Sequence, residues 1–181
     1  MRIPGVMNPN KTYIAFDADG VRDAENSNLR TFNMMAEWQK RYPNRYNFIN
    51  IDSINFSSQH DDTVEDTRKQ AFFRLLDGAD NLLVVITRHT NPDSKWLNWQ
   101  ISRAVNRYHL PVIVAFDGIG CVTDNTIKEM WDKLPVKIRK YIGRDSARMC
   151  YIPFTQTKVE MALHYFSVRS QTYAWNSTTV Y

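Results

Sequence analysis

Two neighbouring stretches decide the fold, the apolar run Leu82-Leu83-Val84-Val85-Ile86 and the sequence Ser94-Lys95-Trp96-Leu97-Asn98-Trp99-Gln100-Ile101. The first predicts a buried strand and the second an amphipathic helix, with Ser94 as the N-cap because its hydroxyl can accept from free amides of the first turn. We expect Trp96 and Gln100, four residues apart, to lie on the border of the buried face, near the N-terminal end of the helix. In a strand-then-helix unit this end opens at the carboxyl edge of the sheet, where ligands bind. The face that we expect to be buried carries Leu97, Ile101, Ala104, Val105 and Tyr108.

The segments before and after this unit alternate in the same way. Strands are predicted near residues 13–16, 46–51 and 111–116, and a helix is predicted from about Thr63 to Gly78. Another helix is predicted over residues 27–42, with Leu29, Phe32 and Ala36 on its buried face. Near-continuous apolar strands between helices are typical of a parallel sheet that is covered on both faces. The sequence therefore predicts a three-layer α/β fold with a central, mainly parallel sheet.

The pattern is weaker after Phe116. Residues 125–141 read as a helix that Pro135 interrupts, and residues 149–154 as an edge strand that carries Pro153. A last amphipathic helix follows around residues 159–166, and we expect the aromatic tail from Ser170 to pack on the domain or on a second subunit. We interpret residues 1–181 as one domain, with a core over about 12–116 and a C-terminal helical extension over about 125–181.

Composition excludes several classes of protein. The 181 residues are 43% hydrophobic, which suits one globular domain and argues against disorder. No apolar run approaches the length of a membrane span and no signal peptide precedes the first strand, so we expect a cytoplasmic protein that binds no membrane. The two cysteines, Cys121 and Cys150, show no zinc-ligand spacing or disulfide framework. The Lys- and Arg-rich segment 128–148 is more typical of a solvated helix face than of a site for an acidic partner.

A family resemblance rests on Trp96-x-x-x-Gln100, which follows the strand Leu82-Leu83-Val84-Val85-Ile86 and the helix start Lys95-Trp96-Leu97. This arrangement resembles the Trp-x-x-x-Glu helix of bacterial TIR-like domains, in particular that of the TIR subunits of Thoeris antiphage defence. The resemblance covers about residues 12–116. It implies a flavodoxin-like fold and an enzyme that cleaves NAD+ at the nicotinamide-ribose bond, with a cyclised or otherwise modified ADP-ribose as the signal for a downstream effector.

The catalytic Glu of that family corresponds to Gln100 here. A Glu would stabilise the positive charge that grows on the ribose as nicotinamide leaves, which lowers the barrier because that charge is largest in the transition state. A glutamine is nearly isosteric and can still hydrogen-bond, but it carries no charge. We therefore expect binding to survive better than turnover, in either an engineered Glu-to-Gln variant or a natural paralogue that binds without cleaving.

The expected pocket lies where the strands end. It would combine aromatic faces for the nicotinamide or adenine with oxygens for ribose hydroxyls. Simpler roles stay open for several members: His89 in a surface turn, Phe56 as a loop anchor, and Asp17 with Asp19 as caps. The residues expected to bind substrate, beside the catalytic position Gln100, are Phe16, Asp17, Asp19, Asp52, Phe56, Thr87, His89 and Trp96.

The resemblance also implies partners. NAD+ enters as the substrate, and no separate cofactor or metal is expected. We expect a homo-oligomer in which the loop 53–62 could reach a neighbouring subunit's pocket, a downstream effector that senses the nucleotide product, and a phage-derived activator. No binding to nucleic acid is expected.

Two rival functions remain. The stretch Ile14-Ala15-Phe16-Asp17-Ala18-Asp19-Gly20-Val21 resembles the first motif of haloacid-dehalogenase-like phosphatases, in which the first Asp is the nucleophile, the second is a general acid/base, and Mg2+ completes the site. Thr87 and Lys95 could stand for the second and third motifs, but only Asp117 is placed to add a later metal ligand. The other rival is a TIR-like interaction module without catalysis, which Gln100 favours if it is native.

Overall fold

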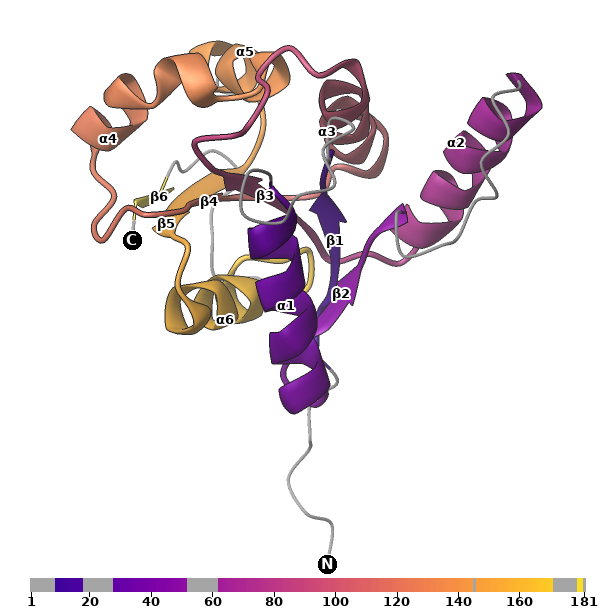
Figure 1. Ribbon diagram of the computed structural model, residues 1–181, viewed down its shortest axis with the longest axis horizontal. Helices are drawn as coiled ribbons and strands as arrows, with labels where there is room; N and C mark the ends of the chain where they lie inside the picture. Colours follow the sequence, from indigo (N-terminus) through magenta and orange to yellow (C-terminus); the bar gives the residue numbers. More distant parts are fainter. Residues whose placement is uncertain (1–8, 18–27, 52–61, 145, 171–178, 181) are drawn as a thin grey trace, which may run out of the picture.

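The computed structural model describes residues 9–17, 28–51, 62–144, 146–170 and 179–180 (Figure 1). They form one six-stranded sheet in the order β2-β1-β3-β4-β5-β6, in which every pair of neighbours is parallel. The chain runs outward from β1 to β2 and then crosses back to β3, so the strand order reverses between β1 and β3. This is the flavodoxin-like order with one short extra strand, and it confirms the predicted fold class. The strands are β1 (Lys11–Ala15), β2 (Asn47–Ile49), β3 (Asn81–Ile86), β4 (Val112–Phe116), β5 (Met149–Pro153) and β6 (Thr179–Val180).

Helices cover both faces of the sheet, as the apolar strands require. Figure 1 shows α1 and α6 on one side and α3, α4 and α5 on the other. The expected interruption at Pro135 is confirmed, because a short 3-10 turn and two separate helices occupy the segment that reads as one. The helices are α1 (Leu29–Arg41), α2 (Asp62–Leu76), α3 (Lys95–Tyr108), α4 (Asp124–Glu129), α5 (Val136–Arg144) and α6 (Gln156–Tyr165).

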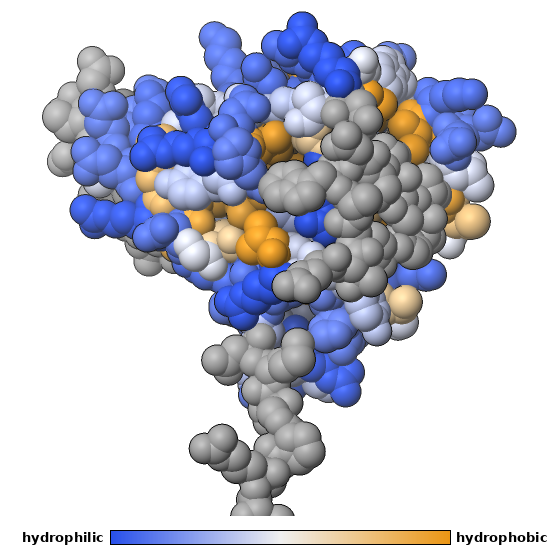
Figure 2. Space-filling view, turned by 180° about the vertical axis from the view of Figure 1, so that it is seen from behind, coloured by the Kyte–Doolittle hydropathy of each residue, from blue (hydrophilic) through white to orange (hydrophobic). Residues whose placement is uncertain are grey.

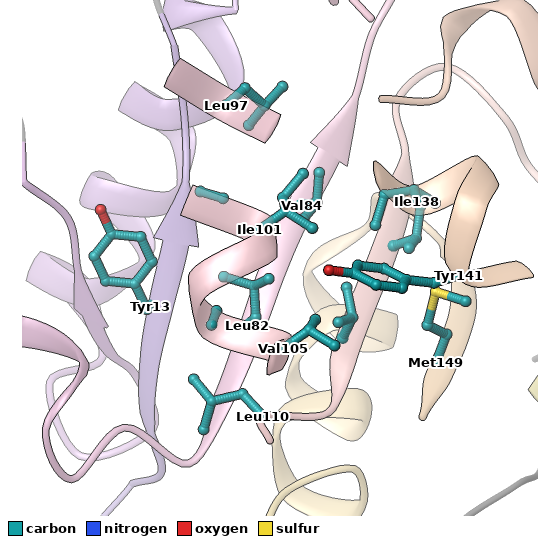
Figure 3. Close-up of a cluster of buried hydrophobic side chains, with 14 of the residues drawn as sticks. Tyr13, Leu82, Val84, Leu97, Ile101, Val105, Leu110, Ile138, Tyr141 and Met149 are labelled. Carbon is teal, nitrogen blue, oxygen red and sulfur yellow. The ribbon is translucent and has the colours of Figure 1, made fainter. Parts of the chain in front are cut away.

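Alternation along the strands divides the core into two clusters. In β1, Tyr13 and Ala15 belong to the cluster beneath α2, α3 and α5, whereas Ile14, with Phe16 just after the strand, belongs to the cluster beneath α1 and α6. Figure 3 shows the first cluster, in which Tyr13 stands beside the buried face of α3. The rear of the molecule is mostly hydrophilic, with apolar residues in small groups (Figure 2).

Two expectations about single elements are wrong. Ala36 is exposed, and Met35 is buried in the core instead, whereas the predicted Leu29 and Phe32 do pack against that cluster. The strand β5 does not lie at the edge, because Thr179–Val180 pairs with it, and its residues are buried in the core clusters on the two faces of the sheet. The N–H of Phe154 points to β4 and donates to Phe116 O at 2.8 Å. Backbone nitrogens alternate in direction along a strand, so the nitrogen of Pro153 points away from β4, and no hydrogen bond to β4 is lost because proline has no N–H.

No helix in the described part of the chain is long and apolar enough to cross a membrane.

Candidate functional site

Ser94 joins the start of α3 to the end of β1. Its hydroxyl oxygen accepts from the N–H of Leu97 at 3.1 Å, which confirms the predicted N-cap. The same hydroxyl donates to the carboxylate of Asp17, which follows β1 directly. Ser94 thus links Asp17 to α3, the helix that carries two other residues of the predicted site, Trp96 and Gln100.

A short hydrogen-bond network continues from Asp17 across the ends of β1 and β3. Asn28, at the start of α1, donates from its side chain to Asp17 O at 3.3 Å, and its own oxygen accepts from the Thr87 hydroxyl at 2.5 Å. The N–H of Thr87 in turn donates to the Thr90 hydroxyl at 2.8 Å. Below this network is a narrow cavity of only about 10 Å3, bordered by Phe16, Asp17, Asn28, Thr31, Thr90 and Leu97. The network therefore fixes polar groups at the point where the strand order reverses.

Gln100 lies inside the core. Its side chain is 0% exposed, its Oε1 accepts from the Tyr13 hydroxyl at 2.8 Å, and its Nε2 donates to Phe16 O at 2.9 Å. The expectation that it lies on the border of the buried face is wrong. A polar side chain is tolerated in the core because both the oxygen and the nitrogen of its amide are hydrogen-bonded. The spacing of apolar residues along the helix cannot reveal those hydrogen bonds.

Trp96 is half-buried and packs on Trp99. The two rings stack with centroids 5.0 Å apart and an angle of 11° between their planes, so Trp96 and Trp99 share one side of the helix. Residues three apart on a helix are surface neighbours, which brings the rings together. The guanidinium of Arg68 lies 4.1 Å from the centre of the Trp96 ring, and Phe72 meets the same ring edge-on at 6.3 Å. Trp96 thus joins an aromatic cluster between α2 and α3.

A wider pocket of about 540 Å3 opens beside the narrow cavity, at the ends of β3 and β4. Two predicted residues, Thr87 and His89, line it. The imidazole Nε2 of His89 accepts from Arg88 Nε at 2.9 Å, and Arg30 forms an ion pair with Asp117 across the pocket. Its full lining is Arg30, Thr31, Thr87, Arg88, His89, Asp117 and Gly118.

The structure thus brings Phe16 and Asp17 to one cavity and Thr87 and His89 to the pocket beside it, whereas Gln100 lines neither. Asp19, Asp52 and Phe56 lie outside the described residues, as does most of the loop 53–62.

Three groups that contribute to this edge were not among the predicted site residues: Asn28, Arg30 and Arg88. Asn28 lies at the start of the helix predicted over residues 27–42 and Arg88 follows a predicted strand, so their positions along the chain were a usable signal. Asp117, the later acid of the phosphatase reading, pairs with Arg30. Within the described ranges no three His, Cys, Asp or Glu side chains gather as a metal site.

Comparison with known families decides the assignment. Residues 13–117, more than half of the chain, match the family described as Thoeris protein ThsB, TIR-like domain. The chain belongs to this family. The matched residues include α3, the hydrogen-bond network, the narrow cavity and all of the wider pocket's lining except Gly118. They agree with the region of resemblance expected from the sequence, about 12–116. Both α5 and α6 follow the region of the ThsB match.

Other comparisons add little to the ThsB assignment. No curated protein matches the chain. A solved structure of a 2-deoxyribosyltransferase from Bacillus psychrosaccharolyticus is 12% identical and has a TM-score of 0.44, with 68% of this chain and 82% of that one covered.

Proposed function

We propose that this ThsB-family chain is the TIR subunit of an antiphage defence system and binds NAD+ at the carboxyl edge of β1 and β3. The observation that carries the proposal is the network of Asp17, Asn28, Thr87 and Ser94 at this edge, inside the segment that matches the family. Open α/β sheets bind ligands at such a reversal of strand order. Hydroxyl, amide and carboxylate groups are suited to ribose hydroxyls.

The reaction would break the bond between the ribose C1′ and the nicotinamide nitrogen. Nicotinamide leaves with the electron pair, and the cationic sugar is captured by water or by a nucleophile within the same molecule, which yields ADP-ribose or a cyclised form of it. In this proposal an acid at position 100 leaves its buried position, ionises and supports bond cleavage, whereas Gln100 allows binding without turnover because it supplies no negative charge.

A second candidate is a TIR-like module that binds or assembles without catalysis. One observation favours it: the amide of Gln100 is fully paired inside the core, as expected of a native structural residue. Under this alternative the residue ties α3 to β1 and never contacts substrate.

The test measures NAD+ binding by calorimetry and nicotinamide release by chromatography for the chain with Gln100 and for Gln100→Glu, with lysate from phage-infected cells as the source of activator. The first proposal expects both proteins to bind NAD+ and only the variant to release nicotinamide, with the product identified by mass spectrometry. Binding without release by either protein supports the second candidate. Absence of NAD+ binding by both refutes the proposed substrate.

A homo-oligomeric assembly, a downstream effector and a phage-derived activator stay predictions of the family resemblance, and a cytoplasmic location stays a prediction from the sequence.

A further inference from the structure

Two arginines of the wider pocket take no part in the network between β1 and β3. We propose that Arg30 and Arg88 bind a diphosphate group, of the kind that links the two halves of a dinucleotide. The inference deepens the proposed function, because it assigns the phosphate-binding part of the same edge of the sheet.

Arg88 is the more available of the two. It is exposed, and no carboxylate of the described residues pairs with it. Its Nε donates to His89 Nε2 at 2.9 Å, which orients the guanidinium and leaves its two terminal nitrogens as donors. A planar guanidinium matches phosphate oxygens with two parallel hydrogen bonds. Arg88 can therefore bind an anion without breaking an ion pair.

Arg30 enters the pocket from the first turn of α1. That turn contains no acidic residue, and the side chain of Asn28 forms no capping hydrogen bond there. The positive end of the helix dipole thus adds to the charge of Arg30 and favours an anion.

Arg30 forms an ion pair with Asp117. The side chains of this pair are 51% and 21% exposed, and ion pairs at such positions are weak. A diphosphate carries more negative charge than one carboxylate, so it can compete for Arg30. The carboxylate of Asp117 therefore competes with the diphosphate for Arg30, and removing that carboxylate favours diphosphate binding.

The pocket has the size and position for this role. Its volume of about 540 Å3 lies within the range of small-molecule sites, roughly 300–1,000 Å3. Thr31 lines both this pocket and the narrow cavity beside Phe16 and Asp17. A ligand with its diphosphate between the arginines could therefore extend toward the network that we propose for ribose.

Calorimetric titration with inorganic pyrophosphate, ADP-ribose and NAD+ tests the inference on the full chain. Arg88→Gln and Arg30→Gln are each expected to weaken the binding of pyrophosphate and ADP-ribose about tenfold or more, because each removes a charged hydrogen-bond donor. Asp117→Asn is expected to tighten binding severalfold. The matched control is Arg45→Gln, which removes another exposed arginine from an ion pair, that with Glu160, outside the pocket.

The outcomes separate this inference from the proposed function. The inference is overturned if the arginine variants and the Arg45→Gln control bind pyrophosphate and ADP-ribose with equal affinity. It is also overturned if Asp117→Asn binds them no more tightly than the unmodified chain does. If NAD+ binds equally well to all variants, the inference fails and the proposed substrate stands. If pyrophosphate and ADP-ribose bind through the arginines while NAD+ does not bind, the inference stands and the proposed substrate fails. Circular dichroism of each variant establishes that it is folded.

Discussion

Replacing Gln100 by Glu tests both the core and the proposed chemistry. In the observed geometry the Nε2 of Gln100 donates to the carbonyl oxygen of Phe16, and an ionised carboxylate would place an oxygen against that carbonyl in a site that is 0% exposed. A protonated carboxyl could keep both hydrogen bonds, donating to Phe16 O and accepting from Tyr13. Burial therefore raises the pKa of the introduced carboxyl, and the folded variant retains its proton.

The cost follows from proton linkage. With an ordinary Glu pKa of about 4.3 in the unfolded chain, keeping the proton at pH 7 costs about 1.36 × (7 − 4.3), or about 3.7 kcal/mol, if the folded pKa lies above 7. At pH 5 the same arithmetic gives about 1 kcal/mol. Because the folded pKa is raised, the native state binds more protons than the unfolded state, so stability relative to wild type falls as the pH rises from about 4.3 to the folded pKa.

Urea unfolding of Gln100→Glu and wild type at pH 5 and pH 7, followed by tryptophan fluorescence, measures this difference. The control is Asn33→Asp, which makes the same amide-to-acid change at an exposed position of α1 and should show little pH-dependent loss. The same loss of stability at both pH values, or none at either, would refute the burial of this side chain. Nicotinamide release by a variant that shows the pH-dependent loss would mean that the carboxylate leaves the core to reach substrate.

Three further predictions concern neighbouring groups. Tyr13→Phe leaves the buried Gln100 Oε1 without that donor, so denaturant unfolding should show a loss of about 1–3 kcal/mol, and an unchanged midpoint would contradict the hydrogen bond. Ser94→Ala removes the N-cap of α3 and a donor to Asp17, with an expected loss of about 1 kcal/mol or more; the same change at exposed Ser146 should cost much less, and equal losses would count against the cap. Burial raises the pKa of the Cys150 thiol, so a thiol reagent should modify only exposed Cys121 in the folded protein even at pH 9, and rapid modification of both cysteines would show that Cys150 is accessible.

The sequence was sufficient for features that depend on neighbours along the chain. Alternating apolar runs and amphipathic helices predicted a parallel α/β sheet, because each pattern reflects burial of a single element. Ser94 was identified as a cap and Pro135 as a break since both effects act within one helical turn. The family resemblance around Trp96 was confirmed by the ThsB match over residues 13–117.

Tertiary structure decided what depends on residues far apart in the chain. Gln100 reads as a border residue along α3, yet it is buried because Tyr13 and Phe16, 87 and 84 positions away, satisfy its amide. Arg30 meets Asp117 across 87 positions, since α1 and the end of β4 come together at the same edge of the sheet. The sequence by itself determined the elements and the edge where the candidate site lies. Only the packed structure decided which side chains face that edge and which face the core, because hydrogen bonds between distant residues set the burial of polar groups.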